Sequence, residues 1–272
     1  MTRPLISPAE LSDRLGEVTV LDVRYQLGGP GGPDEYAAGH IPGAVYVDVG
    51  TELASWPGPG GRHPLPTIDR FQAAMRRAGV NAGHPVVVYD DWQAQAAARC
   101  WWLLRYHGHL DVRVLDGGWS AWVADGGEVE MSTPTPDTGD FTAHPGAMPH
   151  VEADRVPDVG VLVDARAPER YRGETEPIDP VAGRIPGAVN VPTVRNLTED
   201  GRFRSPEELR EIYAEVGAIP GADVAAYCGS GVTACHDVLA MEIAGITAAL
   251  YPGSWSGWIV DLERPVERET RS

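Results

Sequence analysis

Cysteine and basic residues are scarce in this sequence. The chain of 272 residues contains three cysteines, Cys100, Cys228 and Cys235, which are too few for a disulfide framework. It contains 22 Lys and Arg against 39 Asp and Glu, a formal net charge of −17. This charge argues against nucleic acid and against an anionic membrane as partners. A small anionic substrate remains compatible with it, because a pocket can be locally positive.

Long apolar runs are also absent. No stretch approaches the ~18 consecutive apolar residues of a membrane-spanning helix. The opening residues, MTRPLISPAELSDRL, lack the apolar core of a secretion signal. We therefore expect a cytoplasmic protein. The hydrophobic content of 43% is high enough for real cores, and the length suits one large domain or two of about 130 residues.

Most of the sequence occurs twice. Three segments of the first half return in the same order in the second half: LDVRYQLGGPGGPDEYAAGHIPGAVYV from Leu21 matches VDARAPERYRGETEPIDPVAGRIPGAVNV from Val163, VVVYDDW from Val86 matches VAAYCGS from Val224, and VLDGGWSAW from Val114 matches ALYPGSWSGW from Ala249. Two copies of this length indicate a duplicated domain rather than a solenoid. Residues 126–148 are rich in Pro, Gly, Thr and Asp, a linker composition. We expect domains over 1–125 and 149–272, joined by a linker over 126–148.

Each copy alternates short β-branched runs with helical stretches. VTVLDV, PVVVYD, VGVLVDA and DVAAYC predict buried strands. TIDRFQAAMRRAGV predicts a helix capped by Thr67, and SPEELREIYAEVGA predicts one capped by Ser205, with Glu208 three residues later. Alternating strands and helices favour an α/β fold with a mostly parallel sheet in each domain.

The most informative stretch is CGSGVTA, which follows a predicted strand and precedes a predicted helix with one apolar side, VTACHDVLAMEIAG. Ligands of open α/β sheets bind outside the carboxyl ends of strands, so Cys228 lies where chemistry is expected. Gly229 and Gly231 let the backbone N–H groups turn inward, and the helix adds the positive end of its dipole. Both favour a thiolate. The alternative, a buried structural cysteine, does not explain the glycines.

The residues after the cysteine restrict the reaction. A phosphatase loop of this type needs an arginine six residues after its cysteine, where this chain has Ala234, and no basic residue lies between them. Phosphate monoester chemistry is therefore disfavoured. A cysteine that accepts sulfur forms an anionic persulfide, which backbone N–H groups and the hydroxyls of Ser230 and Thr233 are suited to hold.

CGSGVTA, YAAGHIPGAVYV and AALYPGSWSGW resemble the signatures of the two-domain rhodanese and 3-mercaptopyruvate sulfurtransferase family, and the resemblance covers nearly the whole chain. It implies two tandem rhodanese-like domains, of which the first is catalytically silent; Asp90 at the position matching Cys228 agrees with this. It implies double displacement, from a small anionic sulfur donor through a Cys228 persulfide to a thiol or cyanide, with a thioredoxin-like reductant as a further partner. No cofactor and no metal are implied.

The resemblance also assigns roles around the cysteine. It makes Arg170, in ERYRG, the first of two arginines that bind the donor carboxylate, although a solvated surface arginine is the alternative. The second arginine is missing from its usual place after Glu176-Pro177, where Ile178 stands, so Arg184 or Arg172 is a candidate substitute. The remaining substrate contacts are assigned to the loop after the cysteine, at Gly229, Gly231, Val232 and Thr233.

Two catalytic partners of Cys228 are expected. Ser230 supplies a hydroxyl, and His40, in GHIPGA, lies near the interdomain cleft in the family and is a candidate proton relay with it. The alternative for His40 is a structural cap before Pro42. The sequence departs from the family pattern at two positions. Gly257 stands where the family usually has an acidic residue, and Arg184 stands where the second copy often has a histidine.

The donor remains open between two compounds. Family members that favour 3-mercaptopyruvate resemble this chain in the run C-G-S-G-V-T, whereas thiosulfate enzymes carry basic residues just after the cysteine. The serine hydroxyl and the absence of a cation in the loop favour 3-mercaptopyruvate. The alternatives are thiosulfate as main donor, or a slow persulfide carrier that serves as a binding module.

Overall fold

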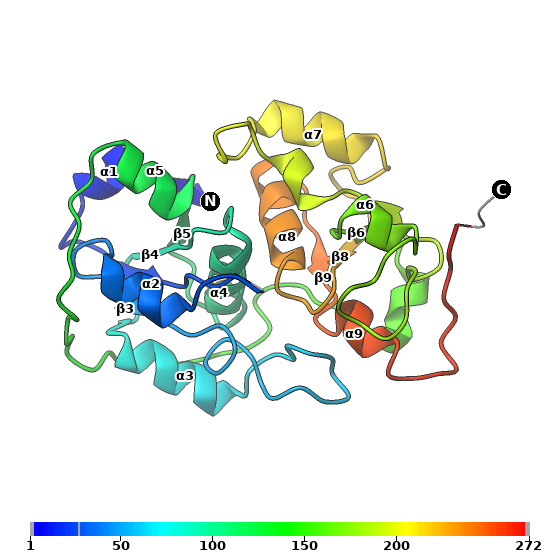
Figure 1. Cartoon of the computed structure of the whole chain (residues 1–272), viewed down its shortest axis with the longest axis horizontal. Helices are drawn as coiled ribbons and strands as arrows, with labels where there is room; N and C mark the ends of the chain where they lie inside the picture. The colour runs from blue at the N-terminus through cyan, green and yellow to red at the C-terminus, as the bar shows by residue number, and fades with distance from the viewer. Residues whose placement is uncertain (1–2, 27, 270–272) are drawn as a thin grey trace. The chain divides into compact units, whose positions relative to one another are not determined.

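The computed structural model describes residues 3–26 and 28–269 and contains two compact units (Figure 1). The first unit consists of the residues up to Ser55, Leu65–Met148 and Glu199–Arg202. The second consists of Trp56–Pro64, Pro149–Thr198 and the residues from Phe203 onwards. Trp56–Pro64, a segment from the first half of the sequence, therefore packs with the second unit. Residues 126–148, the expected linker, pack with the first.

The first unit is built on a five-stranded parallel sheet with the strand order β1-β5-β4-β2-β3. Its strands are β1 Leu5–Ile6, β2 Thr19–Asp22, β3 Val45–Tyr46, β4 Val86–Tyr89 and β5 Val112–Leu115. Its helices are α1 Pro8–Ser12, α2 Gly32–Ala38, α3 Ile68–Arg77, α4 Gln95–Tyr106 and α5 Gly118–Ala124. Strands β2 and β4 lie next to each other near the middle of the sheet, and β4 is buried along its whole length.

The second unit repeats this plan with a four-stranded parallel sheet, β7-β6-β8-β9. Its strands are β6 Val161–Asp164, β7 Val189–Asn190, β8 Val224–Tyr227 and β9 Ala249–Leu250. Its helices are α6 Pro168–Tyr171, α7 Pro206–Ala214, α8 Ala234–Ile243 and α9 Ser254–Trp258, with 3₁₀ turns η1 Ala153–Asp158 and η2 Thr193–Asn196. The counterpart of β1 is reduced to one parallel bridge, between His150 and Leu250. The predicted α/β class with parallel sheets is confirmed.

Local signals explain where several elements begin. Thr67 caps α3 by accepting a hydrogen bond from the Arg70 N–H, and Ser205 and Glu208 form a capping box at the start of α7, as predicted. The expected one-sided burial of α8 is wrong, because residues 234–241 are all buried. Within the described residues, no helix is both long and apolar enough to span a membrane.

The duplication extends to individual side-chain contacts. In the first unit, Arg24 forms a bidentate ion pair with Asp22, and its NH2 group also donates to the carbonyl oxygen of Gly39. In the second unit, Arg166 does the same with Asp164 and the carbonyl oxygen of Gly183. Both arginines thus tie the end of a strand to the loop that follows the next helix.

A tyrosine contact gives a second match between the copies. The hydroxyl of Tyr36 in α2 donates to the carbonyl oxygen of Ala44 at 2.7 Å. The hydroxyl of Tyr171 in α6 donates to that of Ala188 at the same distance. Helices α2 and α6 are therefore equivalent positions in the two units.

Candidate active site

Cys228 is the residue that follows β8, and its side chain is only 2% exposed. Its backbone N–H donates to Ser254 Oγ at 3.0 Å, and the Gly231 N–H donates to Cys228 Sγ at 3.2 Å. Helix α8 begins at Ala234, so the positive end of its dipole faces the loop. The Gly231 N–H and the first turn of α8 are thus both directed at the loop that holds the sulfur.

The backbone around Cys228 is unusually tight at two places. Gly231 has φ +80°, and a Cβ there would overlap the carbonyl oxygen of Pro252, so only glycine fits. Ser254 has φ +51°, in the left-handed region that non-glycine residues rarely adopt. The Ser254 hydroxyl donates to the Tyr251 carbonyl oxygen at 3.0 Å and lies 4.0 Å from Cys228 Sγ. Strain of this kind tends to be retained at functional sites.

Ser230 lies beside a histidine that sequence analysis did not identify. His63 Nδ1 is 2.8 Å from Ser230 Oγ, and Ser230 is buried. A hydroxyl bonded to an imidazole can give or take a proton, because the histidine ring changes charge near neutral pH. The site therefore contains a hydroxyl and imidazole pair two residues after the cysteine.

Two guanidinium groups lie next to the cysteine loop. A Cβ placed on Gly229 would be 2.8 Å from NH2 of Arg62 and 3.5 Å from both terminal nitrogens of Arg170. Glycine at this position therefore leaves room for both guanidinium groups beside the cysteine loop. The loop itself supplies no cation, as expected, but other segments supply two.

Two buried carboxylates hold these arginines from the far side. Asp179 accepts from Nε and NH2 of Arg62 at 2.9 and 3.1 Å and from NH2 of Arg170 at 3.3 Å. Glu176 accepts from Nε and NH2 of Arg170 at 3.1 and 2.7 Å and from NH1 of Arg166 at 3.4 Å. The Nε edges of Arg62 and Arg170 are thus engaged by carboxylates, while terminal nitrogens of both lie beside Gly229.

A glycine on α9 explains how Arg62 reaches this place. A Cβ on Gly257 would lie 3.3 Å from the carbonyl group of Gly60, closer than most such contacts. The Arg62 N–H also donates to Ser256 Oγ at 3.0 Å. The absence of the usual acidic side chain at position 257 therefore leaves space for the segment that carries Arg62 and His63.

Arg184, one of the two candidates for the second substrate-binding arginine, is paired with another part of the chain. It forms an ion pair with Glu267, and its guanidinium carbon lies 4.5 Å from the centroid of the Tyr171 ring. Arg172 pairs with Glu174 at the surface. The guanidinium that joins Arg170 beside Gly229 belongs to Arg62, whereas Arg184 and Arg172, the expected substitutes, are paired with other carboxylates.

His40 belongs to the first unit and is completely buried there. Its ring nitrogens lie 2.9 Å from the Tyr36 carbonyl oxygen and 3.1 Å from that of Ser132. These contacts favour the structural alternative for His40. The histidine that hydrogen-bonds to Ser230 is His63.

Two other loop residues, Val232 and Thr233, are expected to contact the substrate. Val232 is buried, and Thr233 is the residue before α8, where its side chain makes no capping hydrogen bond. Arg62 and His63 carried no motif that pointed to the site. The only indirect signal was the missing second arginine, which implied a donor of charge from elsewhere.

In the first unit, Asp90 occupies the position of Cys228, directly after β4. Its buried carboxylate accepts four backbone hydrogen bonds of 2.7–3.0 Å, from Trp92, Ala94, Ala96 and Ala97. Burial raises the pKa of this carboxyl, and the four N–H donors oppose the rise. The anion-binding loop of this unit is therefore filled by the chain's own carboxylate.

Comparisons with known proteins show which family the whole chain resembles. The model of the rhodanese-like domain matches the chain twice, over residues 7–125 and 150–261. SseB of Mycobacterium tuberculosis, provisionally described as a thiosulfate sulfurtransferase, is 44% identical and the match covers 98% of this chain and 97% of SseB. A Pseudomonas aeruginosa protein, provisionally described as a 3-mercaptopyruvate sulfurtransferase, is 42% identical, with 96% and 97% covered.

Solved structures show the same similarity. The 3-mercaptopyruvate sulfurtransferase of Leishmania major superimposes with a TM-score of 0.87 at 32% identity, over 97% of this chain and 75% of that chain. SseA of Escherichia coli, described as a 3-mercaptopyruvate sulfotransferase, superimposes with a TM-score of 0.83 at 31% identity, over 94% of this chain and 100% of SseA.

Proposed function

Because this chain belongs to the rhodanese family, whose domain it contains twice, we propose that it transfers the thiol sulfur of 3-mercaptopyruvate through a persulfide on Cys228. Its closely similar relatives are sulfurtransferases, and the chain is a sulfurtransferase of this type. The observation that carries the choice of donor is the contact of His63 Nδ1 with Ser230 Oγ, two residues after the cysteine.

The first half-reaction moves one sulfur atom. The Cys228 thiolate attacks the sulfur of the donor, the carbon–sulfur bond breaks, and its electron pair stays on carbon as the enolate of pyruvate. The thiol proton of the donor must leave sulfur, and a proton must reach the enolate carbon to give pyruvate. The products are pyruvate and the Cys228 persulfide anion, held by the Gly231 N–H and the start of α8.

Ser230 and His63 supply the proton transfer in this proposal. The 2.8 Å hydrogen bond lets the hydroxyl pass a proton to or from the imidazole as the thiol is deprotonated and the enolate is protonated. Thiosulfate needs no such step, because it releases sulfite when its sulfur–sulfur bond breaks. Ser230 and His63 therefore contribute to sulfur transfer from 3-mercaptopyruvate but not to transfer from thiosulfate.

Arg62 and Arg170 bind the donor carboxylate. Both place terminal guanidinium nitrogens beside Gly229, and two charged forks match a carboxylate better than one. In the second half-reaction, an acceptor thiolate or cyanide attacks the outer sulfur, and the Cys228 thiolate leaves with the electron pair. A thioredoxin-like reductant in the cytoplasm is the class of acceptor we propose, and all three cysteines of the chain are free thiols.

Thiosulfate is the second candidate donor. The two arginines would also bind its dianion, and SseB of Mycobacterium tuberculosis carries a thiosulfate description. The lack of a cation in the loop therefore disfavours thiosulfate less than the sequence suggests. The proton-transferring pair at Ser230 remains the observation that favours 3-mercaptopyruvate.

The donors are separated by comparing the wild-type protein with Ser230→Ala. If 3-mercaptopyruvate is the donor, wild-type kcat/KM is higher for it than for thiosulfate. Ser230→Ala then lowers pyruvate formation by ~10²-fold in kcat/KM and leaves thiosulfate turnover nearly unchanged. His63→Gln should give a similar loss, and the two losses should not add, because the residues act as one unit. A wild-type preference for thiosulfate would refute the proposed donor.

The role of Cys228 is tested separately by intact mass. Treatment with either donor should add one sulfur atom, about 32 Da, and Cys228→Ser should abolish the gain while Cys100→Ser and Cys235→Ser should not. Retention of the added mass in Cys228→Ser would overturn the mechanism for both donors.

A further inference from the structure

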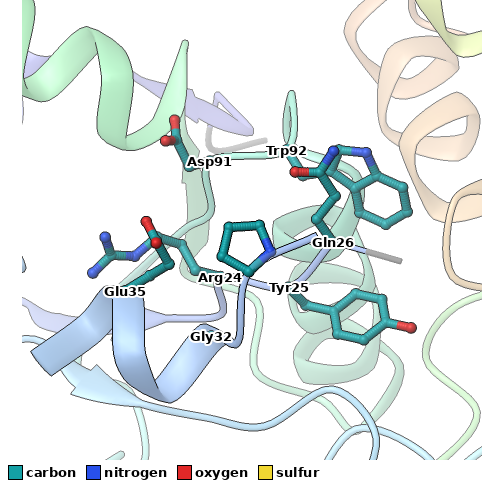
Figure 2. A pocket seen from close by; sticks show the side chains of 8 residues that line it. Arg24, Tyr25, Gln26, Gly32, Glu35, Asp91 and Trp92 are labelled. Carbon is teal, nitrogen blue, oxygen red and sulfur yellow. The ribbon is translucent and has the colours of Figure 1, made fainter. Parts of the chain in front are cut away.

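The first unit has a small pocket at the position that holds the active site in the second (Figure 2). It measures about 60 Å³ and is lined by side chains that follow β2 and β4 and by the first turns of α2: Arg24, Tyr25, Gln26, Pro30, Gly32, Glu35, Asp91 and Trp92. The carboxyl ends of adjacent parallel strands are where ligands of such sheets bind. A single water needs about 10–15 Å³ on this measure, so the pocket has room for a small head group.

Comparison of the two copies shows that two wall positions of this pocket are acidic where the second unit has an arginine or a glycine. Glu35 precedes the α2 tyrosine as Arg170 precedes the α6 tyrosine, so a carboxylate stands where the second unit has a substrate-binding guanidinium. Asp91 follows Asp90 as Gly229 follows the catalytic cysteine, so a second carboxylate stands where the second unit has no side chain. Two matched positions have thus become acidic.

An anion would find no place in this pocket. The loop N–H groups that could hold one are already bonded to the buried Asp90 carboxylate. Arg24 is the one guanidinium among the lining residues, and its charge is offset by Asp22 at 2.7 Å. The first unit is therefore unsuited to the anionic donors that the second unit binds.

Neither carboxylate at the pocket forms an ion pair within the described residues. Asp91 Oδ1 accepts only from the neutral Ser120, at 2.6 Å from the hydroxyl and 3.1 Å from the N–H. The Glu35 side chain is partly buried and makes no hydrogen bond or ion pair within the described part of the chain, although its backbone N–H donates to the Gly31 carbonyl oxygen and its charge acts on Arg24. Both side chains lie at the pocket in Figure 2. Their oxygens are thus placed to accept hydrogen bonds from a ligand in the pocket.

An aromatic corner completes the pocket. The rings of Tyr25 and Trp92 meet edge to face, with centroids 5.9 Å apart, and both line the hollow. Aromatic faces attract cations and also cover apolar stems. Carboxylates with aromatic rings form a surface that suits an organic cation with a short hydrocarbon chain.

We propose that this pocket binds an alkylammonium group, with the nitrogen between Glu35 and Asp91 and the hydrocarbon stem against Tyr25 and Trp92. The duplicated domain has then kept the ligand position of the fold and inverted the charge it selects. The proposal is independent of the sulfur donor and of the chemistry at Cys228.

The test is titration of the intact protein with n-butylammonium chloride, with n-butanol and butyrate as matched probes. Binding is followed by NMR at the indole N–H of Trp92, which is identified among the eight tryptophans by its loss in Trp92→Phe. Only butylammonium should give a saturable shift. Glu35→Gln and Asp91→Asn should each weaken binding about fivefold, as expected for an exposed ion pair. Exposed carboxylates outside the pocket provide the control, as Glu128→Gln and Asp137→Asn, which should leave the shift unchanged.

A peptide, acetyl-Gly-Lys-Gly-amide, distinguishes the two sources of such a group. Binding of the peptide with higher affinity than the free amine would identify a lysine side chain of a partner protein as the ligand. Binding of the amine alone would identify a small molecule. Equal shifts with butanol, no loss in Glu35→Gln and Asp91→Asn, or no saturable shift with either ammonium probe would overturn the proposal.

Discussion

The pairing of Arg62 with Asp179 makes a specific prediction about donor binding. Asp179 lies between the two guanidinium groups and accepts hydrogen bonds from both, and its side chain is only 3% exposed. Arg62 is on a loop segment and is 26% exposed, so little else fixes its head beside Gly229. We expect Asp179→Asn to raise KM for 3-mercaptopyruvate, because Arg62 loses the charge that orients it.

The magnitude follows from the contacts that are lost. A hydrogen bond to a charged group contributes about 1.5–3 kcal/mol, which corresponds to roughly 10- to 150-fold in KM. Arg62→Ala removes one guanidinium completely, so we expect an increase of about 100-fold. Asp179→Asn keeps an acceptor oxygen and removes only the charge, so we expect about tenfold. The value of kcat should change less than about threefold, since the donor carboxylate is bound alike before and during sulfur transfer.

Steady-state pyruvate formation measures both constants. Arg172→Ala is the matched control, because this arginine pairs with Glu174 at the surface and should leave KM unchanged. The exchange variant Arg62→Asp with Asp179→Arg should recover part of the affinity, since it restores the ion pair with the guanidinium at position 179 instead of 62. A lower KM in Asp179→Asn would mean that the carboxylate competes with the donor, and an unchanged KM in Arg62→Ala would remove Arg62 from the clamp.

Three further predictions concern strain, pH and thiol reactivity. Ser254→Gly relieves a left-handed serine, so we expect no loss of thermal stability but about tenfold lower kcat, as the Cys228 loop loses its hydroxyl contact; lost stability instead would contradict the strain argument. Burial lowers the pKa of His107 to about 4, so the unfolded chain binds a proton between about pH 6.5 and 4 that the native state does not. Stability present above pH 6.5 is therefore lost as pH falls, by about 2 kcal/mol at pH 5; urea titrations of His107→Phe should lack this loss. Burial raises the pKa of the Cys100 thiol, so iodoacetamide should modify Cys228 and spare Cys100 in the native protein, and equal labelling would count against this.

Features set by neighbouring residues could be predicted from the sequence. The α7 capping box needs only Ser205 and Glu208, three residues apart, and both sheets follow from short apolar runs between helical stretches. Arg170, which the sequence singles out, does lie beside Gly229. In each case the information lies within one segment or one repeat.

Features set by distant contacts could not be predicted. Arg62 and Asp179 are 117 residues apart, and His63 and Ser230 are 167 apart, so no periodicity links them. The sequence favours His40 over His63 as the partner of Ser230, because His40 stands in the motif GHIPGA. The contact of its Nε2 with a carbonyl oxygen depends on Ser132, a residue of the segment expected to be a linker.

The two departures from the family pattern are connected by the geometry of the second unit. The missing acidic side chain at Gly257 leaves space for the carbonyl of Gly60, which positions the segment ending in Arg62. The missing second arginine leaves its region of the chain to Asp179, whose carboxylate binds that same Arg62. An acidic residue at 257 would crowd the segment, and an arginine at 179 would repel the guanidinium. Either change alone would disturb the position of Arg62, so the two differences are parts of one arrangement. In this arrangement the carboxylate is at position 179, and the guanidinium comes from position 62.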